Sequence, residues 1–128
     1  MDSQDLKTHQ WKNRIILVLS DDEDNTAFKT QIENLKDSSD GCAERKLVLY
    51  QVLPNQITVH YFNENDKKPS PSSSDLYKEF MSVNDTFKMI LIGLDGSIKE
   101  KRAEPISSKD LFSIIDGMSM RQAEMRNN

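Results

Sequence analysis

Three short runs of apolar residues divide the chain, and each has the length of a buried β-strand. The runs cover residues 15–19, 47–53 and 89–92. Continuous runs of this kind are typical of strands that are covered on both faces, as in α/β sheets. A fourth segment, residues 57–62, alternates apolar and polar side chains after a Pro-Asn turn. It predicts a half-exposed strand or hairpin arm.

The segments between these runs carry helical spacing. Asn25 or Thr26 is suited to cap a first helix, which we expect to end near residues 40–41, because glycine accepts the left-handed geometry of a helix end. Ser107, followed three residues later by Asp110, resembles a capping box for the last helix. The apolar residues at helical intervals are Phe28, Ile32 and Leu35, then Leu76 and Phe80, then Leu111, Ile114, Ile115 and Met118.

The resulting element order is β-α-β-α-β-β-α. Asp95-Gly96 is a two-residue hairpin signal between the last two strands. Parallel strands, then an antiparallel hairpin, then a closing helix form the element order of a thioredoxin-like core. We therefore expect an α/β fold of this type, with a central mixed sheet and helices on both of its faces.

The length of 128 residues suits one domain. We expect it to cover residues 11–126, with residues 1–10 as a flexible N-terminal segment. Residues 63–74 predict a mobile loop, because Pro69 and Pro71 disfavour regular strand pairing and the serines add no apolar surface.

Composition narrows the classes of function. The net charge of −4 and the aromatic content of 7% argue against nucleic-acid binding, which needs cationic and stacking side chains. No apolar run approaches the length of a membrane span. His9 and His60 have no metal-ligand spacing, and no glycine-rich phosphate loop is present, so neither a metal nor a cofactor is expected.

The first five residues are polar and acidic, and they do not form a signal peptide. Two localisations stay open. The protein is cytoplasmic if Met1 is the natural start, and secreted or periplasmic if Met1 stands where a signal peptide has been removed.

Four acidic residues, 21–24, directly follow the first strand. Ligands of open α/β sheets bind at the carboxyl ends of strands, and carboxylates can hold Mg²⁺ there. Residues 14–25 look like the opening of a response-regulator receiver, and residues 22–26 fit the DxDxT pattern of haloacid-dehalogenase-type phosphatases. The later acidic and lysine motifs of both families are missing. Carboxylates that favour the helix dipole, or that contact a protein, are the other readings.

Cys42 is the single cysteine, so a CxxC pair and a disulfide framework are excluded. In thioredoxin-like folds the reactive cysteines sit at the junction between the first strand and the first helix, and a cis-proline precedes the third strand. Here that junction holds no cysteine, and no proline occurs between Pro71 and Pro105. A divergent thiol-redox protein that uses Cys42 stays as an alternative.

Several segments together resemble one family. They are residues 11–14 (WKNR), 91–99 (LIGLDGSIK), 104–107 (EPIS) and 111–126 (LFSIIDGMSMRQAEMR). The chain resembles the domain of unknown function shared by equarin, URB and sushi-repeat-containing extracellular proteins, the P-DUDES superfamily, which also has short bacterial members. The resemblance covers residues 11–126 and implies a thioredoxin-like fold without redox cysteines. Leu94 departs from the lysine that is common in the family.

We therefore expect a non-catalytic interaction module with a protein partner. The Mg-dependent receiver-like or phosphatase-like reading of residues 21–24 and the thiol-redox reading are the alternatives. Arg121 and Glu124 follow Gly117, where the apolar helix face should end, so we place them on the surface as contact candidates. Asp22 and Asp24 are the other two contact candidates.

Overall fold

The most apolar run of the sequence forms the central strand of a six-stranded sheet. In the computed structural model, β1 is buried along its whole length, pairs in parallel with β2 and pairs antiparallel with β5. The strand order is β4-β3-β2-β1-β5-β6. Residues 4–7, 9–62, 67–70 and 76–126 are described. The strands are β1 (Arg14–Ser20), β2 (Leu47–Leu53), β3 (Gln56–Tyr61), β4 (Lys67–Ser70), β5 (Phe87–Ile92) and β6 (Ile98–Arg102).

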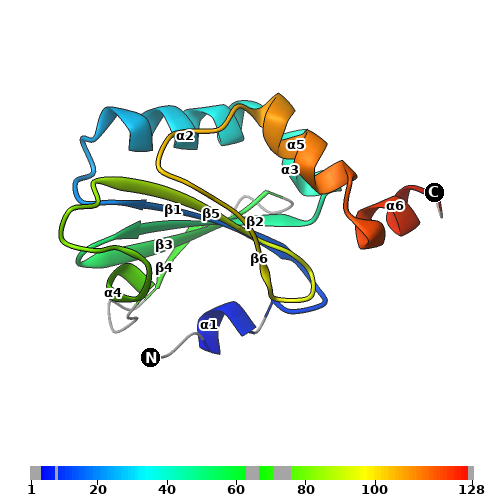
Figure 1. Ribbon diagram of the computed structural model, residues 1–128, viewed down its shortest axis with the longest axis horizontal. Coiled ribbons are helices and arrows are strands. Elements are labelled where there is room, and N and C mark those ends of the chain that lie inside the picture. The colour runs from blue at the N-terminus through cyan, green and yellow to red at the C-terminus, as the bar shows by residue number, and fades with distance from the viewer. Residues whose placement is uncertain (1–3, 8, 63–66, 71–75, 127–128) are drawn as a thin grey trace.

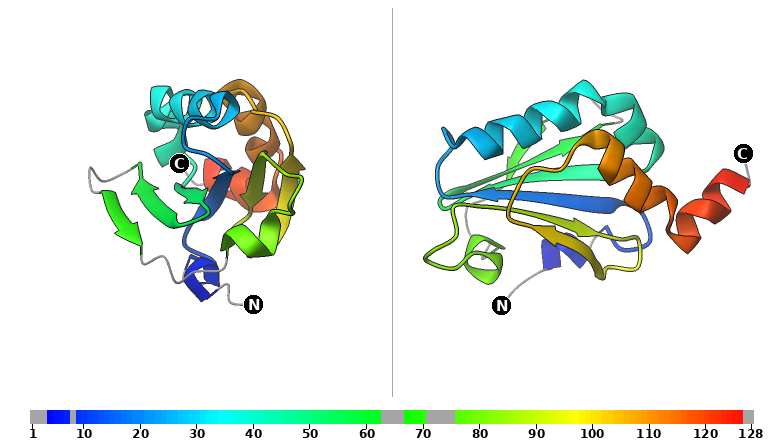
Figure 2. Two further views of the ribbon diagram at one scale, coloured as in Figure 1. Left: turned by 90° about the vertical axis from the view of Figure 1, so that its left-hand side faces the viewer. Right: turned by 45° about the horizontal axis from the view of Figure 1, so that its top comes forward.

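Helices lie on both faces of this sheet, as the sequence predicted. Helices α2, α3 and α5 cover one face, and α1 and α4 lie against the other (Figures 1 and 2). Helix α6 follows α5 and extends past the end of the sheet (Figure 1). The helices are α1 (Gln4–Lys7), α2 (Thr26–Asp37), α3 (Ser39–Glu44), α4 (Leu76–Phe80), α5 (Ser108–Asp116) and α6 (Ser119–Arg126).

The core has two layers, because side chains of a strand alternate between its faces. Ile16 and Val18 of β1 pack with Phe28 of α2 and with Leu111 and Ile115 of α5. The other face of β1 packs with Leu6 of α1 and Leu76 of α4. Burial on both faces explains why the strand is a continuous apolar run and not an alternating one.

Three local signals of the sequence are confirmed. The Asn25 side chain accepts a hydrogen bond from the Phe28 amide and caps α2, and the Ser107 hydroxyl accepts one from the Asp110 amide and caps α5. Gly96 has a φ of 84°, the conformation that the turn between β5 and β6 requires.

The predicted end of the first helix is wrong. Helix α2 ends at Asp37, and Gly41 lies inside a separate helix, α3. A Cβ on Gly41 would lie 2.5 Å from Cε2 of Phe112, so this glycine allows α3 and α5 to approach closely. Glycine is required at this position to avoid a steric clash and not to adopt a left-handed backbone conformation. The rule that a glycine marks a helix end therefore gave the wrong prediction.

Two expected boundaries also change. Leu6 and His9 are buried, so the folded domain includes residues before 11. Residues 67–70, expected in a mobile loop, form β4, and Pro69 is tolerated there because β4 is an edge strand. The remainder of the predicted loop, residues 63–66 and 71–74, lies outside the described residues.

We predict that Ile115→Ala lowers the free energy of unfolding by about 2–5 kcal/mol, because the side chain is fully buried between α5 and the sheet. Ile98→Ala is the matched control, because Ile98 is 44% exposed, and it should cost less than about 1 kcal/mol. Urea unfolding of both variants measures this, and equal losses would contradict the placement of α5.

Candidate functional site

Two arginine side chains lie inside the protein at the end of the sheet where β1 begins. Arg14 starts β1 and is 0% exposed, and Arg121 belongs to α6 and is 1% exposed. A guanidinium stays protonated in a protein, so a buried arginine must be compensated by carboxylates or carbonyl oxygens. The surrounding residues provide both.

Arg121 joins α6 to α3 and α5. Its Nη2 donates to Glu44 Oε2 at 2.7 Å, its Nε donates to Asp116 Oδ1 at 3.0 Å, and its Nη1 donates to Glu124 Oε1 at 3.3 Å. Glu44 ends α3 and Asp116 ends α5. One side chain therefore holds three helix segments together.

Arg45 and Arg14 extend the same network to the sheet. Arg45 donates hydrogen bonds to both carboxylate oxygens of Asp116, from Nε at 3.0 Å and from Nη2 at 2.9 Å. Its guanidinium carbon lies 4.0 Å from the Phe112 ring centroid. Arg14 Nη1 donates to the Arg45 carbonyl at 2.9 Å and to Glu124 Oε1 at 3.3 Å. We call these residues, with Lys46 and Glu44, the arginine cluster: Arg14, Glu44, Arg45, Lys46, Asp116, Arg121 and Glu124.

The cluster shifts the protonation of its carboxylates. Hydrogen bonds from Arg45, and then from Arg121, outweigh burial and hold the pKa of Asp116 below its usual value. Burial acts to raise the pKa of Glu124, but Arg14, Arg121 and Lys46 together lower it. Both carboxylates are therefore ionised at neutral pH, and the arrangement stabilises charge and does not supply an acid or a base near pH 7.

The expected surface position of Arg121 is wrong. Helix α5 does end at Gly117, but Arg121 of α6 is buried, with its guanidinium against Glu44 of α3 and Asp116 of α5. Glu124 is only partly exposed, at 16% of its side chain, and accepts hydrogen bonds from Arg14 and Arg121. The two residues share one ion-pair network, so their first role is to hold α6 in place.

Three of the four segments that carry the family resemblance, 11–14, 91–99 and 111–126, meet at this end of the molecule. The Trp11 amide donates to the Leu94 carbonyl at 2.6 Å, and Arg14 from the same segment reaches Glu124. Trp11 and Lys46 are the two non-glycine residues with a left-handed φ in the described chain, at 69° and 58°. Such backbone costs energy and persists where neighbouring contacts impose it.

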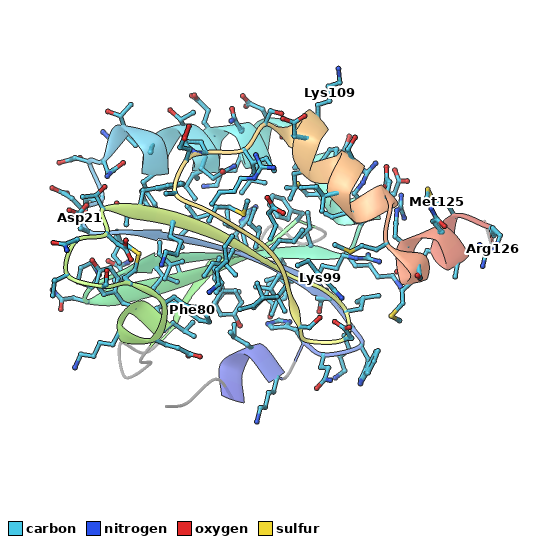
Figure 3. All side chains as sticks on the ribbon, in the orientation of Figure 1. Asp21, Phe80, Lys99, Lys109, Met125 and Arg126 are labelled. Carbon is cyan, nitrogen blue, oxygen red and sulfur yellow. The ribbon has the colours of Figure 1, made fainter. Side chains whose placement is uncertain are left out.

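The acidic loop lies at the opposite end of β1. Figure 3 shows Asp21 at one end of the molecule, with Met125 and Arg126 toward the other. Asp22 Oδ1 accepts the Asp24 amide at 3.0 Å, and Asp24 lies 3.5 Å from Lys29 Nζ. The four acidic residues precede Asn25, the cap of α2, so none of them lies in the first helical turn. The interpretation that they stabilise the helix dipole from the first turn therefore does not apply.

The described residues bring together no group of three or more histidine, cysteine, aspartate or glutamate side chains that could hold a metal. His9 is instead buried, with Nε2 2.9 Å from the Tyr50 hydroxyl. The acidic loop borders a hollow of about 450 Å³ with residues 53–56 of the β2–β3 turn. The structure thus shows an exposed anionic edge there.

Cys42 lies inside α3 and is fully buried. Burial raises the pKa of its thiol to about 12, and the nearby Arg45 opposes this rise only partly. Since the thiolate is the reactive form, this cysteine behaves as a small apolar core residue.

The fold and the comparisons agree on the class of protein. The structure is similar to the reduced 2-Cys peroxiredoxin of Plasmodium vivax, with a TM-score of 0.62 over 94% of this chain and 84% of that chain, at 16% identity. At this identity the likeness shows the fold alone, and it confirms the expected α/β thioredoxin-like class. No described helix is long and apolar enough to cross a membrane.

The chain belongs to the family described as "Domain of unknown function (DUF4174)", which matches residues 5–124. It is also similar to the sushi repeat-containing protein SRPX2 of Rattus norvegicus and of Mus musculus, at 24% identity over 115 residues, and to that of Homo sapiens at 22%. These matches cover 89% of this chain but only 24% of each relative, so the chain spans about a quarter of their length. The family resemblance read from the sequence is confirmed.

We predict that Arg121→Ala lowers the free energy of unfolding by about 3 kcal/mol, because it leaves carboxylates from three segments without their shared cation. Arg126→Ala, on the exposed side of the same helix, should change it by no more than about 0.5 kcal/mol. Chemical unfolding compares them, and a silent Arg121→Ala would contradict the buried network.

Acid should weaken the cluster. The folded-state pKa values of Asp116 and Glu124 lie below the ordinary values of 3.8 and 4.5, so the unfolded chain takes up protons first as the pH falls. The stability from these groups is present above the ordinary values and is lost as the pH falls through the folded values. Unfolding experiments from pH 7 down to about pH 2 measure the slope, which should appear below about pH 5. Asp116→Asn should be less stable at neutral pH and show a shallower slope, and an unchanged slope would contradict this role.

Proposed function

We propose that this chain is a non-catalytic thioredoxin-like interaction module that binds a protein partner. The observation that carries the proposal is the junction between β1 and α2, where thioredoxin-like enzymes hold their reactive cysteine. Here the junction runs from Ser20 to Asn25 without a cysteine, and its side-chain hydrogen bonds only shape the loop and cap α2.

Two further features support the absence of thiol chemistry. The single cysteine, Cys42, lies in α3, and its thiol is buried and has a raised pKa. The residue before β5 is Thr86, whose carbonyl accepts hydrogen bonds from the Asp21 amide and from Asn25 Nδ2. The position that docks substrates in thiol enzymes is therefore hydrogen-bonded here to the loop that follows β1.

The relatives support the proposal that this domain is a module. A match of 115 residues occupies about a quarter of the sushi repeat-containing relatives, so there the same domain is one part of a longer chain. A domain that recurs inside longer chains is a reused unit of structure, and its function is argued from its own site.

Asp22 and Asp24 are the contact candidates that fit the proposal best. Both are exposed, and they border the hollow of about 450 Å³ beside residues 53–56. Exposed charge mainly steers association and sets specificity, so a basic segment of a protein is the partner chemistry that this edge favours.

Absence of thiol turnover is the direct test. We predict that insulin reduction and peroxide consumption by the protein match buffer, and that Cys42→Ser gives the same rates. Turnover that disappears in Cys42→Ser would overturn the proposal in favour of the thiol-redox alternative.

Partner capture tests the contact residues. The double variant Asp22→Asn/Asp24→Asn should retain the melting temperature and bind a captured partner more weakly, with a salt-sensitive association rate in the unmodified protein. Glu104→Gln is the matched control, since Glu104 is an exposed acid on a different segment. Equal binding by the double variant and the control would remove the acidic loop from the interface.

A further inference from the structure

A cavity of about 350 Å³ lies beside the arginine cluster, between the β5–β6 hairpin and the turn that joins α5 to α6. It is lined by Arg14, by Leu94, Asp95 and Lys99 of the hairpin, and by residues 117–120. All of these residues belong to the segments on which the family resemblance rests. The cavity lies at the end of β1 opposite to the acidic loop, as Lys99 and Asp21 in Figure 3 show.

Arg14 lines this cavity, and its guanidinium is incompletely used. Nη1 makes both of its side-chain hydrogen bonds, to the Arg45 carbonyl and to Glu124. Nε and Nη2 are buried and make no hydrogen bond to any residue that the structure describes. Unpaired buried donors are costly, so a group that supplies acceptors here is favoured.

The unused pair of nitrogens has a defined partner chemistry. Nε and Nη2 form one edge of a guanidinium, with two parallel donors that match the two oxygens of a carboxylate. The same cluster contains the filled version of this arrangement, because Arg45 uses its own Nε and Nη2 to hold both oxygens of Asp116 at 3.0 and 2.9 Å. The Arg14 edge makes no such pair among the described residues, and Glu124, which Arg14 contacts through Nη1, turns its Oε2 to Lys46 Nζ at 3.7 Å.

The charges around the cavity favour an anion, although the whole chain is acidic. The arginine cluster pairs four cations with three carboxylates, which leaves one formal positive charge in excess. At the rim, Lys99 pairs with Asp95 at 3.2 Å and adds no net charge. Gly93 makes room for this lysine, because a Cβ there would lie 2.6 Å from Lys99 Cε.

The start of α6 also lines the cavity. Ser119 and Met120 belong to its first turn, whose amide groups have no partners within the helix. Met118 precedes the helix and has no side-chain oxygen with which to cap it. A helix start of this kind favours a negatively charged group.

We propose that this cavity binds the carboxylate of a small ligand that has a short apolar substituent. The carboxylate would occupy the Nε–Nη2 edge of Arg14, and the substituent would contact Leu94, Met118 and Met120, which line the same cavity. A single excess positive charge matches a monoanion better than a phosphate dianion. The leucine at position 94 keeps this wall apolar, while Lys99 provides the basic side chain of the hairpin. This inference does not depend on the proposed function, which concerns the other end of β1.

Titration of the full chain with sodium butyrate tests the proposal. The readout is the Nε–Hε NMR signal of Arg14, identified by its loss in Arg14→Lys, with sodium chloride at matched ionic strength as the reference. We expect a saturable shift with half-saturation in the millimolar range, since a ligand of so few atoms gains little binding energy, and no saturable shift with chloride. Arg14→Lys removes the paired donors and should abolish or weaken binding about tenfold, as detected by the change in melting temperature with butyrate.

Two variants keep the test independent of the stability of Arg14 variants. Lys99→Gln removes the cation that pairs with Asp95, adds one net negative charge at the rim, and should raise the half-saturation concentration about threefold. Lys101→Gln, an exposed neighbour on β6 outside the cavity, should leave it unchanged. No saturable shift with butyrate, an equal response to chloride, or equal behaviour of the two lysine variants would overturn the proposal. Tighter binding of inorganic phosphate than of butyrate would overturn the carboxylate assignment.

Discussion

Two arginines that cannot lose their charge are buried at one end of this protein, and the packing of α6 against α3 and α5 follows from their compensation. Arg121 needs acceptors on several sides, and it finds them on α3, α5 and α6. Arg14, at the start of the central strand, shares Glu124 with it. Helix α6 extends past the end of the sheet (Figure 1), so ion pairs, more than apolar contacts, fix its position. Removal of one member would leave the remaining charges incompletely compensated, which is more costly than the loss of a surface ion pair.

The two ends of β1 carry different features. The end at Ser20, where thioredoxin-like enzymes carry out thiol chemistry, holds an exposed acidic loop and a capped helix here. The end at Arg14 holds the arginine cluster, two left-handed non-glycine residues and a cavity. The family resemblance rests mainly on segments at the second end. A chain can thus keep the thioredoxin-like fold while its most distinctive residues lie away from the catalytic position of that fold.

Local signals in the sequence predicted most of the fold. The buried strands, the caps at Asn25 and Ser107 and the hairpin at Gly96 each depend on residues that are close in the chain. The role of Gly41 was predicted wrongly because glycine is needed there for a close approach to Phe112, which lies 71 residues further along the chain. Arg121 was misread for the same kind of reason. Nothing within α6 marks that residue as buried, since its partners Glu44 and Asp116 come from other elements and only the fold brings them together.

The central claim is that the arginine cluster fixes α6 against the body of the domain. Amide hydrogen exchange of the Arg121→Met variant, which retains side-chain volume but not charge, tests this claim most directly. The account predicts that amides of α6 and of the α3 end near Glu44 exchange faster, while amides of α2 and of the core of β1 stay protected under native conditions. Unchanged protection of α6 in this variant would show that apolar packing, and not the buried ion pairs, holds the helix, and would contradict the account.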